Sequence, residues 1–362
     1  MRIDAHTHFL TPGMLAALRE RSEPPFVESA AGGVEILRSR EAAFAFTPEH
    51  YDLQTRLDYM RKVGLDAQVL SFPAGRGLDV LRGQEGVRLV CRYNDDLAGF
   101  CAANRSRFAG LGGLPYADMA QAAAELRRLR GLGLAGAVVP AGYLRSEAGL
   151  EELAPVLRAA EEVGALLMVH PSPRVDDAPA PRFADHAMHR VSTVELFSSL
   201  AHAMVTLLCS RQLDGFRNLF LHVIDLGGSA LMLYERMHQM QAVRAGAAPV
   251  QWERLDRVVF DTSSVGPHAV EHAVRTYGAA RLMLGTDYPY FPTDESVKAL
   301  EQARIGAADR NAIESGTICA LLDRLGAGFV PVKGTQAPMG LDPARTATPA
   351  IPAAPATHSL RT

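Results

Sequence analysis

Three histidines and one aspartate stand where short apolar runs of the sequence end. His6 and His8 close the run "RIDAHTH", His170 closes "LLMVH" and Asp287 closes "LMLGTD". Residues two apart on a strand share a face, so both histidines of the first run can reach one ion. Imidazole nitrogens and a carboxylate oxygen suit Zn²⁺, with one position left for water or substrate. If these strand ends meet in space, the sequence predicts a metal site.

Eight apolar runs could position these side chains. They span 2–6, 67–72, 108–114, 135–140, 165–170, 218–225, 257–262 and 281–287. Each run is nearly continuous, which is typical of parallel strands covered on both faces. Helical patterns lie between them, at 51–63, 88–104, 117–131, 149–163, 186–210 and 265–278.

This alternation predicts an α/β fold, a (β/α)8 TIM barrel in a single domain over 1–334. A doubly wound open sheet is the alternative. The barrel is preferred because the carboxyl ends of its strands converge on one mouth, which would bring the four polar residues together. Residues 22–48 form a small insertion after the first strand and include a hairpin. Residues 335–362 are rich in Ala, Pro and Thr, and we expect this tail to be disordered because it has little apolar surface to bury.

The composition narrows the class of protein. Of the 362 residues, 48% are hydrophobic, and the formal net charge of −3 comes with no basic block, so nucleic acid and anionic membrane are poor candidates for partners. The four cysteines form no CxxC pair, which argues against a disulfide framework. The start "MRIDAHTHF" lacks the pattern of a signal peptide, and no uncharged apolar run of membrane-spanning length is present. We therefore expect a cytoplasmic protein with a small-molecule substrate.

The sequence also resembles a known family. The segments "IDAHTHF", "NDDLAGFCAANRSRFAGLGGLP", "VHPSP", "LGGSALMLYERM" and "GTDYPY" are similar to those of the amidohydrolase superfamily, in the branch of aminocarboxymuconate-semialdehyde decarboxylase-like proteins. The resemblance covers about 1–325. It implies that His6, His8, His170 and Asp287 are metal ligands and that the protein could form a homodimer.

The resemblance also bears on the number of metal ions. Other members of the superfamily bridge two metals with a carboxylated lysine on the fourth strand. This chain has only Lys62, Lys298 and Lys333, none of them in or beside a predicted barrel strand, so one metal ion is expected.

The stretch "LFLHVIDLGGS" offers two candidates for a further catalytic group. His222 and Asp225 are three residues apart, and strand side chains alternate, so only one of them should face the interior. Asp225 directly precedes the turn, where the family usually has a histidine that orients or deprotonates metal-bound water. We therefore expect Asp225 to face inward and His222 to pack outward against the helices. An aspartate beside a cation should have a lowered pKa and be a weak base, although Asp225 could still accept a hydrogen bond from metal-bound water or become an extra ligand.

Two further residues are candidates of lower rank. Arg236 in "YERM" matches an arginine that holds a substrate carboxylate in the resembling decarboxylase, and a guanidinium can grip a carboxylate through two hydrogen bonds; a surface helix arginine is the plain alternative. Asp261 in "FDTSS" could support the metal site from behind or cap the next helix.

The expected function is a metal-dependent decarboxylase of a small unsaturated or aromatic carboxylic acid. It would use one divalent ion, Zn²⁺ first, with Mn²⁺ or Fe²⁺ as alternatives. Asp287 would be both ligand and proton carrier, and Asp225 would position water. One alternative is a hydrolase of a lactone, ester or amide that uses metal-bound water. A second is a binding protein on the same fold that has lost its catalytic base.

Overall fold

Eight parallel strands form one sheet whose order follows the chain. In the computed structural model, which describes residues 1–30, 34–39, 43–177, 183, 185–244 and 250–332, all eight predicted strands are present. They are β1 (Ile3–His8), β5 (Ala67–Ser71), β6 (Phe108–Gly112), β7 (Gly136–Pro140), β8 (Leu166–His170), β9 (Phe220–Val223), β10 (Val258–Asp261) and β11 (Leu282–Met283). The expected tail at 335–362 lies outside the described residues.

The first and last strands meet and nearly close the sheet into a barrel. The amide of Ala5 donates to the carbonyl oxygen of Leu284 at 2.8 Å, and the amide of His8 donates to that of Tyr288 at 2.7 Å. The chain after β11 therefore runs beside β1. The barrel prediction is confirmed, and the open doubly wound sheet is excluded because its outer strands would not pair.

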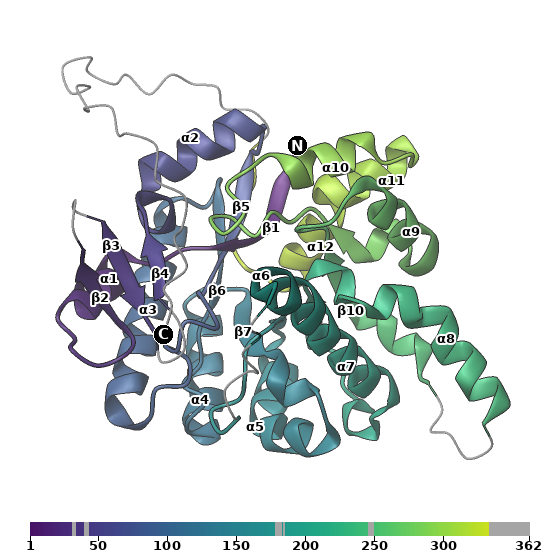
Figure 1. Cartoon of the computed structure of the whole chain (residues 1–362), viewed down its shortest axis with the longest axis horizontal. Coiled ribbons are helices and arrows are strands. Elements are labelled where there is room, and N and C mark those ends of the chain that lie inside the picture. Colours follow the sequence, from purple (N-terminus) through teal and green to yellow (C-terminus); the bar gives the residue numbers. More distant parts are fainter. Residues whose placement is uncertain (31–33, 40–42, 178–182, 184, 245–249, 333–362) are drawn as a thin grey trace.

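Helices cover the outside of the barrel, as Figure 1 shows. They are α1 (Pro12–Arg19), α2 (Leu53–Val63), α3 (Gly83–Ala103), α4 (Met119–Gly131), α5 (Glu147–Val163), α6 (Ala187–His189), α7 (Leu196–Cys209), α8 (Ala230–Val243), α9 (Pro267–Tyr277), α10 (Glu295–Gln302), α11 (Ala307–Asn311) and α12 (Thr317–Arg324). Local signals fix several ends. The Asp52 side chain caps α2 by accepting from the amide of Thr55, and Gly64 ends that helix in the left-handed conformation.

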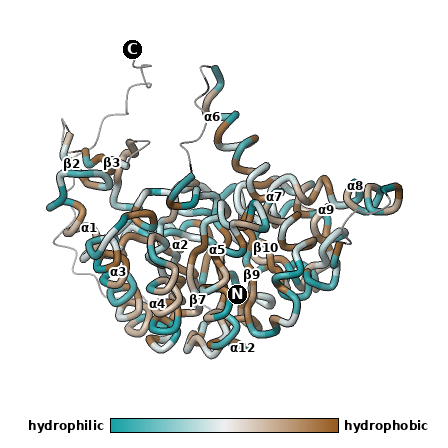
Figure 2. The backbone as a smooth tube through the Cα atoms, turned by 90° about the horizontal axis from the view of Figure 1, so that it is seen from below, coloured by the Kyte–Doolittle hydropathy of each residue, from teal (hydrophilic) through white to brown (hydrophobic). Residues whose placement is uncertain are grey.

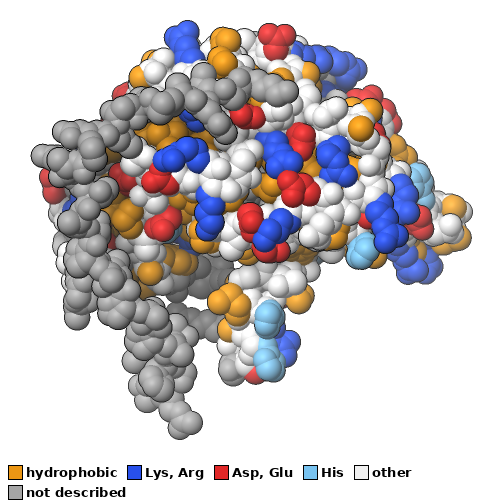
Figure 3. Space-filling model, turned by 90° about the horizontal axis from the view of Figure 1, so that it is seen from above, with side chains coloured by type: hydrophobic (Ala, Val, Ile, Leu, Met, Phe, Trp, Pro, Cys, Tyr) orange, Lys and Arg blue, Asp and Glu red, His pale blue; other side chains and the backbone are white. Residues whose placement is uncertain are grey.

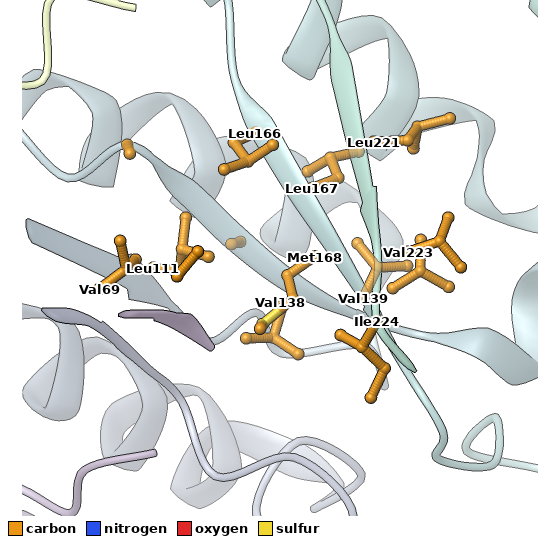
Figure 4. Packing of buried hydrophobic residues seen from close by; sticks show 14 of the residues in the cluster. Val69, Leu111, Val138, Val139, Leu166, Leu167, Met168, Leu221, Val223 and Ile224 are labelled. Carbon is orange, nitrogen blue, oxygen red and sulfur yellow. The ribbon is translucent and has the colours of Figure 1, made fainter. Parts of the chain in front are cut away.

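Branched and long apolar side chains of successive strands fill the core. Figure 4 shows Val69, Leu111, Val138 and Met168 among them, and all four are buried. Strands covered by helices outside and by packed side chains inside must be apolar on both faces, which is why their sequences read as continuous runs.

The insertion after β1 is a small antiparallel sheet. It consists of β2 (Phe26–Ser29), β3 (Glu35–Arg38) and β4 (Ala43–Phe46), one strand more than the predicted hairpin requires. Figure 2 shows that this sheet and α6 extend from the same side of the barrel. The insertion thus stands over one end of the barrel.

Within the part of the chain that the structure describes, one helical segment is long and apolar enough to cross a membrane by length and composition. It runs over Ala187–Cys209, with a mean hydropathy of 1.4 in its most apolar window, 39% of which is buried. Length and composition alone qualify it, and core helices of globular proteins meet the same criteria.

In the face that Figure 3 shows, basic and acidic side chains are interspersed.

Candidate metal centre

The four predicted ligands come together at the carboxyl end of the barrel. One donor atom from each of His6, His8, His170 and Asp287 lies within 4.8 Å of those of the other three. The Asp287 Oδ1 atom is 3.1 Å from His8 Nε2 and 3.5 Å from His6 Nε2. Two residues of β1, the end of β8 and the turn after β11 thus converge on one point.

The partners of the two β1 histidines fix which ring nitrogen is available. His6 Nδ1 lies 3.0 Å from a carboxylate oxygen of Asp261 and 3.1 Å from Ser263 Oγ. His8 Nδ1 lies 3.0 Å from Ser71 Oγ and 3.3 Å from the carbonyl oxygen of Phe72. In the neutral rings, a proton on each Nδ1 can donate to one of these oxygens and leave the Nε2 lone pair for a metal ion. This is the arrangement that metal-binding histidines use.

Buried polar atoms without partners support the fit of a cation at this point. His6 Nε2, His8 Nε2, His170 Nδ1 and Asp287 Oδ1 are all buried and have no hydrogen-bond partner among the described residues. Leaving such atoms unsatisfied costs roughly 1–3 kcal/mol each. A divalent ion would satisfy the donor set with nitrogen and oxygen ligands.

Asp287 reaches the site from a turn and not from a strand end. β11 stops at Met283, and Asp287 has a φ of +57°, in the left-handed region. Its amide donates to the carbonyl oxygen of His6 at 2.9 Å. Asp4 in β1 anchors the approach to this turn, because its carboxylate accepts from the amide and the hydroxyl of Thr286 at 3.0 and 2.6 Å. An aspartate held in a left-handed conformation by neighbours on both sides is typical of a functional site.

The expectation that His222 packs outward is wrong. Its ring is fully buried, its Nε2 lies 2.7 Å from Asp261 Oδ2, and its ring centroid is 6.2 Å from that of His6. Asp225 also faces this region, since its Oδ1 lies 2.5 Å from Ser263 Oγ. The alternation argument fails because β9 ends at Val223. Asp225 lies in the following turn with a φ of +51°, so strand parity no longer applies to it.

Asp261 joins these groups behind the ligand set. Its Oδ2 contacts both His6 and His222, while its Oδ1 accepts from the amides of Ser263 and Asp225 at 3.0 and 3.2 Å. Burial raises the pKa of Asp261, but the charge of His6 and the hydrogen bonds from both histidines outweigh burial and hold this pKa well below its usual range. Asp261 is therefore an anion that orients two imidazoles, and it does not cap α9, which begins at Pro267.

Among the protein's own groups, Asp225 has the opposite electrostatics to Asp261; the expectation of a lowered pKa concerned a metal ion beside it and stays a prediction. Burial and the neighbouring charge of Asp261 raise the pKa of Asp225 to about 7. The geometry agrees. Ser263 Oγ lies 2.5 Å from Asp225 Oδ1 and 2.6 Å from Asp261 Oδ1, but the hydroxyl has one hydrogen to donate. The second short contact requires a proton on a carboxyl group, and Asp225 is the group that can carry it.

A largely apolar cavity opens beside His8. It is lined by His8, Phe9, Leu10, Leu37, Phe44, Phe46, His50, Pro73, Arg76, Leu78 and Tyr290. Three of these, Leu37, Phe44 and Phe46, come from the small inserted sheet. The insertion therefore forms one wall of the cavity next to the candidate metal centre.

Arg236 is not brought to this cavity. It is exposed on α8 and is not among the cavity residues. His186 and His189 are exposed as well. Within one chain, the geometry gives none of these three side chains a contact with the candidate centre.

Two residues near the candidate centre were not predicted from the sequence: His222, which lies behind the ligand set, and Arg76, which lines the cavity. His222 was considered but was expected to face outward. The Gly-rich turn in "VIDLGG" could have indicated that the strand ends before Asp225, where the alternation of side chains no longer applies. Arg76 follows β5 in "FPAGRG", a loop at the carboxyl end of a barrel strand, which is where such barrels place their sites. No pattern in the sequence around Arg76 predicted its contact with Phe44 of the insertion.

Comparisons with known proteins agree with this architecture. Residues 3–208 match the family model described as Amidohydrolase. A curated relative, 2-amino-3-carboxymuconate-6-semialdehyde decarboxylase of Dictyostelium discoideum, is 25% identical over 254 residues, which cover 68% of this chain and 69% of the relative. Gamma-resorcylate decarboxylase of Rhodococcus jostii (strain RHA1) is 25% identical over 279 residues, which cover 72% of this chain and 84% of that protein.

Solved structures share the fold. The 5-carboxyvanillate decarboxylase of Sphingomonas paucimobilis has a TM-score of 0.70 at 24% identity and covers 89% of this chain and 98% of its own. A dihydroxybenzoic acid decarboxylase of a Polaromonas species, solved with bound manganese and the inhibitor 2-nitroresorcinol, has a TM-score of 0.67 at 21% identity. It covers 89% of this chain and 96% of its own.

Proposed function

Because this chain belongs to the Amidohydrolase family, we propose that it is a carboxy-lyase that uses one divalent metal ion to remove CO₂ from a small aromatic or unsaturated acid. The carboxylates in the names of its relatives, a muconate semialdehyde, a resorcylate and a vanillate, support this substrate class.

His6, His8, His170 and Asp287 would hold the ion. Three imidazoles and one carboxylate suit Zn²⁺, and manganese is bound in the Polaromonas relative, so Mn²⁺ is the alternative to test beside it. When bound, the ion would supply positive charge that binds and polarises oxygen groups of the substrate.

The apolar cavity directly beside these ligands is the observation that carries the proposal. Its walls include Phe9, Phe44 and Phe46, against which a flat ring could pack. Decarboxylation disperses the charge of a carboxylate into the ring, and exclusion of water favours the dispersed charge over the localised one.

The chain's own groups would manage the proton. The bond between the ring carbon and the carboxyl carbon breaks, CO₂ leaves, and the electron pair left on the ring carbon takes up one proton. Asp287 Oδ1 faces the histidine nitrogens, which leaves Oδ2 to carry this proton to the ring carbon. Asp225, with its pKa raised to about 7 by burial and by Asp261, can hold a proton near neutrality and would restore it through a positioned water molecule.

Neither alternative function is favoured by a specific observation. Hydrolysis of a lactone, ester or amide would use the same ligands, but the relatives described above are decarboxylases. A binding protein that had lost its base is disfavoured because Asp225 and His222 are both connected by hydrogen bonds to the buried anion Asp261 behind the ligand set.

The test is CO₂ release from the metal-loaded protein. We would incubate it with 2,6-dihydroxybenzoate and 5-carboxyvanillate in D₂O, then measure CO₂ and locate deuterium in the product by NMR. The proposal predicts CO₂ and one deuterium at the carbon that lost the carboxyl group. Asp287→Asn should abolish both signals, while Asp256→Asn, at an exposed aspartate paired with Arg281, serves as a control for the same chemical change.

Two results would contradict the proposal. One is lactone or ester hydrolysis at a high rate without CO₂ release from any of these acids. The other is CO₂ release that persists at the parental rate in Asp287→Asn.

A further inference from the structure

Arg76 is the only side chain with a permanent charge among the described residues that line the cavity. The other polar groups there are His8, His50 and Tyr290. Burial, together with the charge of Arg76, lowers the pKa of His50 to about 4, so this imidazole is neutral at physiological pH. One cation therefore stands alone in a largely apolar pocket, where a countercharge would interact with it strongly.

The guanidinium of Arg76 is held in place by aromatic rings. Its Cζ lies 3.7 Å from the ring centre of Phe44 and 4.2 Å from that of Tyr290, and its Nε donates to the Tyr290 hydroxyl at 3.0 Å. These contacts join the insertion, the loop after β5 and the turn that carries Asp287. A guanidinium fixed on its faces presents its edge in a set direction.

The outer edge of this guanidinium has no acidic partner. No described Asp or Glu forms an ion pair with Arg76, and neither of its terminal Nη atoms makes a hydrogen bond to a described residue. By contrast, Arg82, six residues along the chain, pairs with Asp176 at the surface. Two parallel N–H groups without a partner match the two oxygens of a carboxylate.

We propose that Arg76 binds a second anionic substituent of the substrate, so that the preferred substrate is an aromatic acid with one acidic group beside the metal centre and another at Arg76. This inference rests on the proposed function. The anion at Arg76 is not the carboxylate that leaves. A guanidinium on the departing carboxylate would stabilise the ground state more than the transition state, in which that charge has moved to the ring, and would slow the reaction.

Binding of two matched ligands tests the inference independently of turnover. Salicylate with a carboxylate at position 5 and salicylate with a carboxamide at position 5 have nearly the same size and differ by one charge. Calorimetry with the metal-loaded full chain should show that the parent binds the dicarboxylate about 10- to 100-fold more tightly, the range expected for a charge-assisted hydrogen-bonded pair. Arg76→Met should reduce this preference to less than about threefold, and Arg76→Lys should retain part of it.

Two variants control for indirect effects. Arg82→Met removes a nearby arginine outside the cavity and should keep the parental preference. Tyr290→Phe removes only the hydroxyl that accepts from Arg76 Nε, so it should weaken the preference less than Arg76→Met does. Thermal unfolding of each variant identifies any that fails to fold. If Arg76→Met does not fold, the ligand preferences of Arg76→Lys and Tyr290→Phe are compared with that of the parent instead.

The outcomes separate this inference from the proposed function. Equal binding of the two ligands by the parent, or an unchanged preference in Arg76→Met, would overturn the role of Arg76 even if CO₂ is released from monoanionic acids. A charge preference that depends on Arg76, with no CO₂ release from any acid, would support the anion site and contradict the decarboxylase proposal.

Discussion

Replacing Asp261 with Asn should weaken metal binding although Asp261 is not one of the proposed ligands. Its Oδ2 accepts from His6 and His222, and its Oδ1 accepts from the amides of Ser263 and Asp225. The Ser263 hydroxyl also lies 2.6 Å from Oδ1, so Asp261 accepts hydrogen bonds on both of its oxygens. An amide accepts on one side only, so Asn cannot reproduce this arrangement.

Both orientations of the amide are unfavourable. If its NH₂ group faces the two backbone amides, donors meet donors, at a cost of about 1–3 kcal/mol for each amide left unsatisfied. If it faces the histidines, His6 must accept at Nδ1 and carry its proton on Nε2, the nitrogen proposed to bind the ion. Loss of such a supporting partner typically reduces metal affinity about 10- to 100-fold, which corresponds to about 1.4–2.7 kcal/mol.

Metal-dependent stabilisation gives a direct assay. At a free metal concentration 100 times the parental Kd, binding stabilises the folded parent by about 2.7 kcal/mol. A variant whose Kd is 10- to 100-fold higher gains only about 1.4 to 0.4 kcal/mol at the same concentration. Unfolding curves with and without Zn²⁺ or Mn²⁺, together with competition against a chelator, measure this difference, and Asp256→Asn is the matched control. A folded Asp261→Asn protein whose metal affinity is within threefold of the parent would refute the reasoning.

Four further predictions follow from the same structure and sequence. Elemental analysis should give close to one divalent ion per chain, and a reproducible value of two would reject the single site. Asp225→Asn and His222→Gln should each lower kcat at least tenfold without loss of fold, because both contact the Asp261 network; full activity in either would remove that residue from the proton route. Arg236→Ala should leave KM unchanged in a preparation that light scattering shows to be monomeric, and a higher KM there would contradict the exposed position on α8. Removing residues 335–362 should leave activity and Tm nearly unchanged, because the composition of this segment offers little to bury; a Tm drop of several degrees would refute this.

The sequence was sufficient to predict the barrel because its signals are local and repeated. Each strand is a short apolar run, and helix ends such as Asp52 and Gly64 carry their own capping residues. The proposed ligands were also predictable. They stand near the carboxyl ends of strands, and the barrel topology brings those ends together without any knowledge of side-chain packing.

Contacts that depend on two distant segments were not predictable in this way. Arg76 and Phe44 are brought into contact by the position of the inserted sheet over the barrel, and no periodicity in either segment encodes that position. The cavity wall therefore became visible only with the structure. The same holds for the pairing of Asp4 with Thr286, which joins the first strand to the segment after the last.

The error about His222 has a specific cause. Parity along a strand relates two side chains only while the backbone stays extended, and here it stops being extended between Val223 and Asp225. Asp225 and Asp287 both occupy left-handed turns after short strands, and both point into the site. Asp261 differs from them because it lies on β10, as the histidines of the site lie on β1, β8 and β9.

The position of Asp225 in the turn after β9 also explains its charge state. A carboxylate on a turn beside β10 must lie close to Asp261, and two buried carboxylates that share one serine hydroxyl cannot both be ionised at low cost. His6 and His222 stabilise the negative charge on Asp261, so the proton belongs on Asp225. The position where the resembling family has a histidine is thus occupied by an acid whose pKa, about 7, has been brought by its surroundings close to that of a histidine. The raised pKa of Asp225 is thus the observation that supports the proton-carrying role proposed for this replacement.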